Sequence, residues 1–195
     1  MNRFKNVSFT SFFLLMSLVM MFAAVSGCEQ KVTITPEIQK VITYKFGESR
    51  EPLEDVEDIV RDSYGDSALR LNLEKQFAAI LSMDEATYEA KDFACRQLMF
   101  IGTDESVKEI AALLPDEKLS DMARYALEQN TSPAVDKALI KALNNTEGLQ
   151  LVGIINTISN RRNANAIDSL QKFTSNSNAQ VAKAAAAAIA KLNSL

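Results

Sequence analysis

The feature that most constrains this chain is a helical pattern that recurs about every thirty residues between Gly102 and Leu192. Leu151 follows Met122 by 29 residues, and Val181 follows Leu151 by 30. When the six-residue segments that begin at these three positions are aligned, every copy is apolar in four of the six columns. One helical hairpin cannot bury its own apolar face, so this spacing predicts hairpins that stack and cover one another. The aligned segments, each predicted to be the second helix of a hairpin, are 122–127, 151–156 and 181–186.

A predicted first helix precedes each of these segments. Its apolar residues recur at spacings of three and four, which places them on one helical face. Ser132 can cap one such helix with Pro133 at its first position, and Ser177 with Gln180 has the spacing of a capping box. An unrelated set of helices is the alternative, but the aligned columns favour repeats. The apolar positions are Val107, Ile110, Leu113 and Leu114, then Val135, Leu139 and Leu143, then Ile167, Leu170 and Phe173.

The composition also indicates an all-α protein. The 195 residues are enough for one domain with a sizeable core, and only six glycines and four prolines interrupt many helix-forming residues. The formal net charge is −4, and it becomes −6 without residues 1–27, which carry Arg3 and Lys5 but no acid. Phosphate binding needs a basic surface, so nucleic acid is not expected as a partner.

The residue inventory argues against catalysis and metal binding. The chain has no histidine, which is the commonest general base and the commonest transition-metal ligand. Its two cysteines, Cys28 and Cys95, are too few for a disulfide framework or a zinc cluster. Asp92 and Asp121 are able in principle to transfer protons, but both fall on helical faces predicted to be exposed. We therefore predict no catalytic residues, no metal site and no cofactor.

The first 27 residues have the layout of an export signal, with a short basic start and a largely apolar run from 7 to 25. The run ends in Val25-Ser26-Gly27-Cys28, which resembles the lipobox of bacterial lipoproteins. That resemblance implies cleavage before Cys28, attachment of diacylglycerol to its thiol and acylation of the new amino terminus. An uncleaved transmembrane helix is the alternative, because about 19 apolar residues can just span a bilayer. The small residues before the cysteine and the polar residues after it favour cleavage.

Two or three acyl chains hold a protein stably on its membrane. Glu29 stands where an aspartate would resemble the inner-membrane retention signal of Gram-negative lipoproteins, so the outer membrane, facing the periplasm, is expected in a Gram-negative cell. The tether 29–35 reaches at most about 25 Å. The pattern of segment 36–46 suits a helix or a strand, and Pro36 favours a short helix. The predicted divisions are a signal peptide at 1–27, the lipidated cysteine, tether and ambiguous segment at 28–46, and a repeat domain at 47–195.

Three further helical patterns precede the aligned repeats. The first begins near Ser49 and is predicted to cover the open end of the stack. Asp66 begins a helix, and Ser82 with Glu85 has capping-box spacing for another that continues to Ile101, so these two make a further hairpin. The apolar face predicted for the helix after Asp66 consists of Leu69, Leu73, Phe77, Ile80 and Leu81.

Several stretches between roughly residues 47 and 193 carry a family resemblance, namely Gly47–Leu53, Ala90–Leu98 with Gly102-Thr103, Met122–Glu128, Ser132–Asp136 and Leu151–Asn156 with Arg161–Asn163. Together they resemble a group of bacterial HEAT-repeat proteins. The resemblance implies a right-handed α-solenoid of about four HEAT-like hairpins with an N-terminal capping helix. HEAT-repeat proteins mostly act as scaffolds with an extended concave face, so a membrane-anchored scaffold that binds protein partners is expected. Some HEAT-like proteins are lyases that attach chromophores to phycobiliproteins, but no organised pair of acids resembles such an active site.

In such a stack the second helices line the inner curve, and we predict that their polar columns form a partner-binding groove. A solvated face without a partner is the alternative. Arg161 and Arg162 close a helix, where capping of free carbonyl groups is the alternative to partner binding. The candidate partner-binding residues are Asp121, Arg124, Glu128, Gln150, Asn156, Arg161, Arg162 and Lys183.

Two positions remain ambiguous at this level. A repeat spacing of 29 places Cys95 in the column of Arg124, and a spacing of 28 places it in the apolar column of Ala123. A buried cysteine that behaves as a small hydrophobe is favoured over a reactive thiol. The run 184–188 reads as part of the last inner helix, whose outer flank is left for fraying, a partner or self-association. A structural, self-associating envelope protein is therefore the alternative function.

Overall fold

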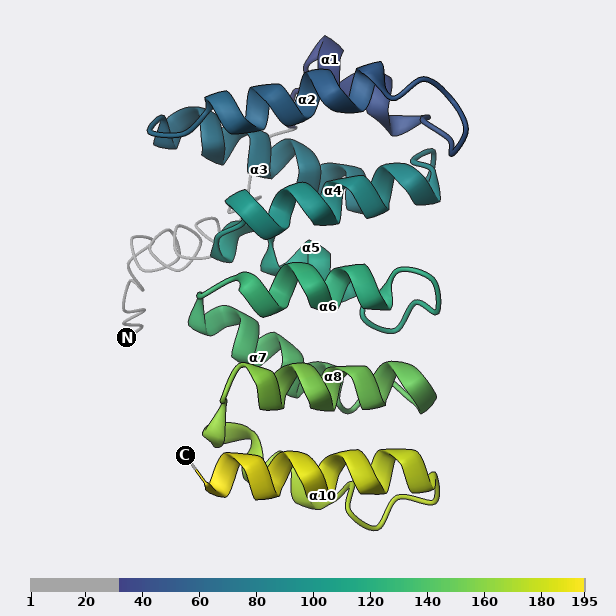
Figure 1. Cartoon of the computed structure of the whole chain (residues 1–195), viewed down its shortest axis with the longest axis vertical. Helices are drawn as coiled ribbons and strands as arrows, with labels where there is room; N and C mark the ends of the chain where they lie inside the picture. The colour runs from purple at the N-terminus through teal and green to yellow at the C-terminus, as the bar shows by residue number, and fades with distance from the viewer. Residues whose placement is uncertain (1–31, 195) are drawn as a thin grey trace, which may run out of the picture. The chain divides into compact units, whose positions relative to one another are not determined.

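The computed structural model describes residues 32–194, so the predictions for the signal peptide and Cys28 lie outside the described residues (Figure 1). Across 32–194 every regular element is a helix, which confirms the all-α prediction. The compact unit begins at Val32 and so includes the segment 36–46, whose sequence pattern suits a helix or a strand. Within that segment α1 is a helix, as favoured, because Ile38 and Val41 bury its apolar side against the rest of the unit.

The helices follow one another with short connections. The α-helices are α1 (Pro36–Ile42), α2 (Glu51–Asp62), α3 (Ser67–Ser82), α4 (Tyr88–Ile101), α5 (Val107–Ala112), α6 (Ser120–Gln129), α7 (Pro133–Ala142), α8 (Gly148–Asn160), α9 (Ile167–Gln171) and α10 (Ala179–Asn193). Two 3₁₀ turns, η1 (Asp104–Ser106) and η2 (Ala164–Ala166), lead into α5 and α9.

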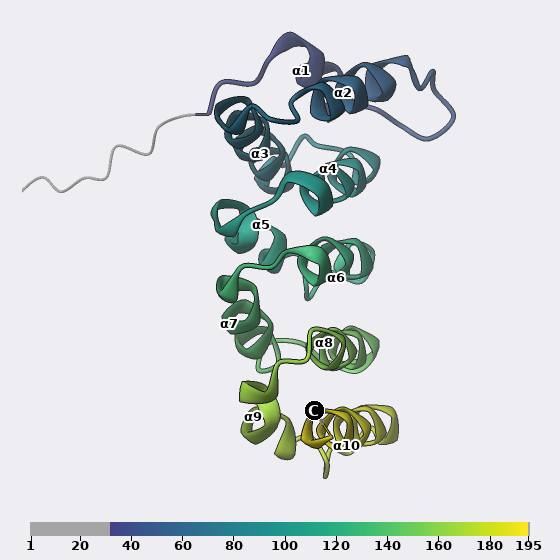
Figure 2. The same cartoon turned by 60° about the vertical axis from the view of Figure 1, so that its left-hand side comes forward.

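Consecutive helices pack as pairs, and the pairs lie one after another in two layers (Figures 1 and 2). Helices α2, α4, α6, α8 and α10 form the front layer, in which each contacts the next. Helices α3, α5, α7 and α9 form the rear layer. Because each pair contacts the pairs before and after it, its apolar side is covered by neighbours, as the repeat spacing predicted.

The core lies between the two layers, and its pattern corrects the predicted register. Ala123 and Leu127 of α6 occupy the buried positions that Leu151 and Ile155 occupy in α8, a spacing of 28 and not 29. The spacing of 30 from α8 to α10 is retained, since Val181 and Ala185 are buried in the same way. The one-residue error arose because Met122 is apolar but lies at the edge of the core, where sequence alone does not separate it from Ala123.

The helix starts confirm some predicted caps and correct others. The Asp66 side chain accepts a hydrogen bond from the Leu69 backbone N–H at 2.9 Å. Ser132 similarly caps α7, with Pro133 in its first turn. The other two predictions were wrong: Ser82 is the last residue of α3 and Thr87 caps α4, while Asn178, not Ser177, caps α10.

The connections displaced these caps. Thr87 also donates a hydrogen bond to the backbone oxygen of Tyr44 at 2.6 Å, which fixes the start of α4 against the segment after α1. Asn176 accepts from the backbone N–H of Asn178 at 2.9 Å and so turns the chain one residue further before α10 begins. The spacing of a capping box in the sequence does not indicate either of these hydrogen bonds.

Buried polar side chains join successive pairs. Glu74 of α3 is fully buried, and its carboxylate accepts hydrogen bonds from the backbone N–H groups of Thr103 at 2.6 Å and Ser106 at 3.2 Å. Asn130 donates to the Thr103 backbone oxygen at 2.7 Å. These bonds satisfy the free N–H groups at η1, so they fix how one pair sits on the next.

Candidate partner-binding surface

The predicted polar columns lie on the outward side of α6, α8 and α10, which we call the front face. Asp121 is 85% exposed at its side chain, and Asn156 and Lys183 are exposed on α8 and α10. Gln150 and Glu128 are half-buried. The structure therefore places these candidates on three successive helices of one layer (Figure 1).

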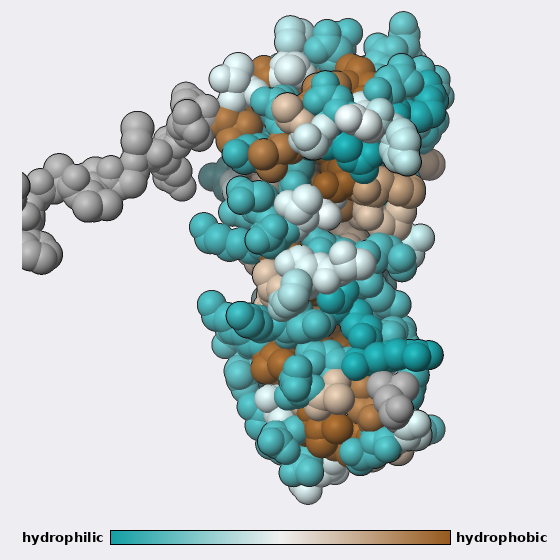
Figure 3. All heavy atoms as spheres, turned by 90° about the vertical axis from the view of Figure 1, so that its left-hand side faces the viewer, coloured by the Kyte–Doolittle hydropathy of each residue, from teal (hydrophilic) through white to brown (hydrophobic). Residues whose placement is uncertain are grey.

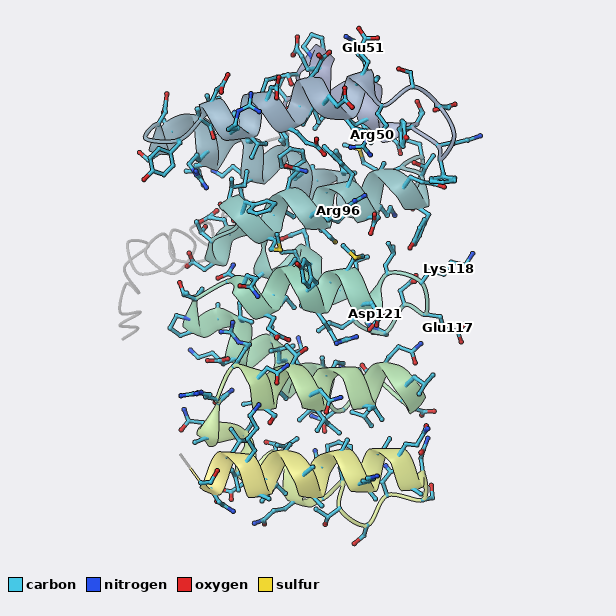
Figure 4. The ribbon with its side chains drawn as sticks, viewed as in Figure 1. Arg50, Glu51, Arg96, Glu117, Lys118 and Asp121 are labelled. Atoms are coloured by element: carbon cyan, nitrogen blue, oxygen red, sulfur yellow. The ribbon has the colours of Figure 1, made fainter. Side chains whose placement is uncertain are left out.

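Charged residues continue over the N-terminal helices of the same layer. Figure 4 marks Arg50 and Glu51 at the start of α2, Arg96 on α4 and Asp121 in the first turn of α6. Arg96 donates a hydrogen bond to Asp92 one helical turn earlier at 2.6 Å. This part of the layer carries paired charges, whereas α8 and α10 present amides and lysines.

Arg124 lies between α6 and α8 and is only 21% exposed. Its Nη2 donates to Asp121 at 2.5 Å, and its guanidinium packs over Gly153 of α8. A Cβ atom at Gly153 would stand 2.5 Å from Arg124 Nε, so only glycine leaves room for this packing. The Nε atom is buried and finds no hydrogen-bond partner within residues 32–194. Arg124 is thus a partly covered cation that its neighbours hold in place.

A line of hydrogen bonds crosses the front layer from α6 to α10. The Glu128 carboxylate accepts from Thr157 at 3.1 Å and from the Asn160 amide at 3.2 Å. Asn160 in turn accepts from Lys191 Nζ at 3.1 Å. On α8 the predicted candidate Asn156 is exposed, whereas its neighbour Thr157 is buried. Glu128 is therefore largely occupied by α8, and Asn156 is available to a partner.

Arg161 has a structural role in this protein. Its side chain is 9% exposed and donates to Asp136 at 2.8 Å. Its Nη1 also donates to the backbone oxygens of Leu127 at 2.9 Å and Asn130 at 2.5 Å, at the C-terminal end of α6. The capping alternative thus describes Arg161, although the capped helix is α6 and not its own helix α8.

Arg162, the neighbouring candidate, is exposed and adopts a positive φ of 57° immediately after Arg161, the C-cap of α8. This left-handed conformation ends the helix, since the N–H of Asn163 bonds back to the Ile158 oxygen at 3.3 Å. Its side chain is free of the contacts that engage Arg161, so Arg162 is the more accessible cation of the two.

Exposed aromatic residues were not anticipated from the sequence. Tyr125 on α6 is 52% exposed, next to Arg124, while Tyr64 after α2 and Phe100 on α4 are 87% and 66% exposed. Leu69, predicted to be buried, is 38% exposed because it lies in the first turn of α3, before the helix meets its neighbours. For Tyr64, the only sign of exposure in the sequence is its position in a turn, directly before Gly65.

Cys95 is completely buried, which resolves its column in favour of a core residue. Burial and, secondarily, the charge of Asp92 raise the pKa of its thiol to about 12. The thiol is therefore protonated at neutral pH. Among residues 32–194, no three potential ligands cluster as a metal site.

No protein-family model and no curated protein matches this chain. None of the helices in the described part of the chain is both long and apolar enough to cross a membrane.

Proposed function

We propose that this protein is a membrane-anchored scaffold that binds protein partners through the front face of a HEAT-like repeat domain. In this proposal residues 47–195 form a right-handed α-solenoid of about four hairpins, with α2 as the capping helix. The observation that carries it is the ordered contact of α4, α6, α8 and α10, which presents polar residues of successive helices on one surface. Repeats of this kind bind extended segments of other macromolecules.

The anchor is Cys28, lipidated after removal of residues 1–27. The sequence Val25-Ser26-Gly27-Cys28 supports this part of the proposal. In a Gram-negative cell the protein would face the periplasm from the outer membrane. The short tether 29–35, at most about 25 Å long, keeps the domain near the bilayer, so its partners are envelope proteins.

The chemistry of the front face suits a protein ligand. Asp121, Asn156 and Lys183 offer an anion, an amide and a cation on neighbouring helices. Mixed groups of this kind form hydrogen bonds and ion pairs with a peptide or a folded surface, whereas a nucleic acid requires a basic stripe. The absence of histidine from the sequence and the engagement of Glu128 with α8 support a binding role over a catalytic one.

Affinity purification from solubilised envelopes tests the proposal. We expect the wild-type protein to retain a reproducible partner, and we expect Asn156→Ala combined with Arg124→Ala to reduce its recovery. Lys108→Ala is the matched control, because Lys108 is exposed on α5 of the rear layer. Failure to recover any partner, or equal losses with the control, contradicts the proposal.

Self-association is the second candidate, and α10 supplies its observation. Ala186, Ala187 and Ala190 are exposed on the last helix of the stack, where no further pair follows within the described residues. Small apolar residues allow another helix to approach closely. Light scattering separates the candidates, since a monomer at micromolar concentration contradicts self-association and leaves the scaffold proposal standing.

A further inference from the structure

A hollow of about 560 Å³ opens where the end of α2, the start of α3 and the end of α4 meet. Val60 and Ile101, both buried core residues, form its floor, and Tyr64 and Phe100, which are 87% and 66% exposed, stand at its mouth. We call it the aromatic hollow. It lies at one edge of the stack, on the side seen in Figure 3, where apolar residues show among hydrophilic ones. None of the candidate residues of the front face lines it.

The lining of the hollow contains one buried amide, that of Gln97 on α4. Gln97 is only 5% exposed, and its side chain makes no hydrogen bond to any of residues 32–194. The unpaired side-chain atoms of these residues that are sealed from solvent belong to other side chains, so the Gln97 amide is open to the hollow. It therefore offers the hollow one unused acceptor and unused donors.

The buried glutamine of the neighbouring helix shows that this is not the rule in the protein. Gln76 of α3 is fully buried and uses both ends of its amide. Its Oε1 accepts from the Thr35 backbone N–H at 2.7 Å, and its Nε2 donates to Asn72 Oδ1 at 2.7 Å. Buried amides are normally bonded in this way, because an unpaired one costs free energy. The free amide of Gln97 thus points to a ligand that supplies the missing hydrogen bond.

The charges of the lining are unequal once their partners are considered. The lining carries Glu57, Arg61 and Arg70. Glu57 lies 3.6 Å from Arg50 and Arg61 lies 2.7 Å from Asp58, so both already have a partner of opposite charge. Arg70 donates to a backbone oxygen of α4 at 2.8 Å but has no carboxylate partner within residues 32–194. The charge that remains available in the hollow is therefore positive, and it suits a carboxylate.

We infer that the aromatic hollow binds a peptide segment of a partner protein, which inserts a tyrosine or tryptophan side chain that stands beside an acidic residue. The inserted ring packs between Tyr64 and Phe100, its O–H or N–H bonds to the Gln97 amide, and the neighbouring carboxylate pairs with Arg70. Tyrosine and tryptophan fit because each joins a large apolar ring to one polar atom that needs a partner when buried. Small-molecule sites enclose most of their ligand, whereas these rings stand in water, which favours a side chain carried by a larger chain. This site is separate from the front face and from the lipid anchor.

Fluorescence tests this inference because the chain contains no tryptophan. A phage-displayed library of random peptides is selected on the purified full-length chain in lipid nanodiscs, after removal of phage that bind empty nanodiscs. We expect the selected peptides to share Tyr or Trp next to Asp or Glu. A synthetic Trp form should show a saturable blue shift of its emission. The Tyr form should displace it at least about fivefold better than a form with Phe in place of Tyr, because Phe lacks the hydroxyl group.

Variants assign each contact. In Gln97→Met, which keeps a similar volume and loses the amide, the Tyr and Phe peptides should bind equally. In Arg70→Gln, an acidic peptide should lose its advantage over the form that carries the matching amide. Phe100→Ala should weaken every peptide at least about fivefold. Phe46→Ala is the matched control and should leave the affinity unchanged, because its ring is 90% exposed in the loop before α2.

The stability of the free protein gives an independent readout. Gln97→Met should be at least as stable in urea as the wild type, because it breaks no hydrogen bond within residues 32–194. Gln76→Met should be less stable, because it breaks the bonds to Thr35 and Asn72. Circular dichroism of the variants used for binding shows that a lost affinity does not reflect a lost fold.

The inference is overturned by any of these outcomes: no enrichment from the library, a consensus that lacks Tyr and Trp or lacks an acid, a preference for Tyr over Phe that Gln97→Met leaves intact, or binding that Phe100→Ala leaves unchanged. A loss of stability in Gln97→Met equal to that in Gln76→Met also overturns it. None of these outcomes affects the front-face proposal, because that proposal is tested with different residues.

Discussion

Arg124 and Arg161 show how two cations predicted to bind a partner are used within the fold. Arg161 donates hydrogen bonds to Asp136 and to carbonyl groups at the end of α6. Arg124 has one partner, Asp121, and lies over a glycine that leaves space for it. The same residue type thus supplies a cap in one place and a partly accessible cation in the other. The difference follows from which groups of the neighbouring pair lie within reach.

Replacement of Arg161 should destabilise the protein. Arg161→Ala leaves Asp136 and three carbonyl groups at the C-terminal end of α6 without their donor, and we expect the free energy of unfolding to fall by about 3 kcal/mol. Urea denaturation followed by circular dichroism measures the change. Arg162→Ala is the matched control and should have little effect, because Arg162 is exposed. Equal stability of both variants would show that the cap contributes nothing.

Cys95 should be unreactive in the folded protein. Burial raises its pKa from an ordinary value of 9.0 to about 12, so the thiolate that reacts with disulfide reagents is scarce at pH 8. In a Cys28→Ser background Cys95 is the sole thiol. We expect slow labelling of the native protein and fast labelling in urea. Fast labelling of the native protein would contradict the burial.

The same shift gives a pH dependence of stability. Between pH 9 and 12 the unfolded thiol loses its proton while the folded thiol keeps it, so the unfolded state binds fewer protons and stability falls as pH rises. Cys95→Ala removes this contribution. The loss of stability from pH 9 upward should therefore be less steep in Cys95→Ala, and identical slopes would refute the assignment.

At the scale of the helix, Arg162 terminates α8 in the left-handed backbone conformation, which residues other than glycine rarely adopt. Arg162→Gly relieves that strain, and we expect the free energy of unfolding to rise by about 1 kcal/mol. Arg162→Ala keeps the Cβ atom and so should not stabilise. Thermal denaturation of the two variants checks the difference. A Gly variant no more stable than the Ala variant would show that the strain is compensated locally.

The sequence was informative about helices and less so about their ends and their register. Apolar spacing predicted the pairs that include α7 and α8, and local signals predicted the caps at Asp66 and Ser132. The start of α4 was missed because Thr87 is fixed by a hydrogen bond to Tyr44, 43 residues away. The residue pattern within one helix does not indicate a hydrogen bond to a distant segment of the chain. For the same reason the partners of Arg161 were not predicted.

The candidate site divides in the same way. Exposure of Asp121, Asn156 and Lys183 followed from helical periodicity, since opposite faces of one helix differ in burial. The role of Gly153 beneath Arg124 depends on contact between α6 and α8 and required three-dimensional structure.

For the whole molecule, the proposed lipidation of Cys28 would determine where the helical domain acts. Cys28→Ser removes the proposed acceptor thiol, so we expect the protein to leave the membrane fraction or to accumulate as its precursor. Fractionation with immunoblotting, and intact mass of the membrane form, measure this. Cys95→Ser is the matched control and should remain on the membrane. Unchanged fractionation and unchanged size of the Cys28→Ser protein would contradict the lipoprotein proposal.

Site-specific photo-crosslinking in living cells tests the central claim that the front face binds a partner. A photoreactive phenylalanine analogue placed at Tyr125 or Asn156 should yield one reproducible crosslinked protein. The same analogue at Lys108 or Asp168, exposed positions of the rear layer, should not. Crosslinks of equal yield from both layers, or none from the front positions, would contradict the account.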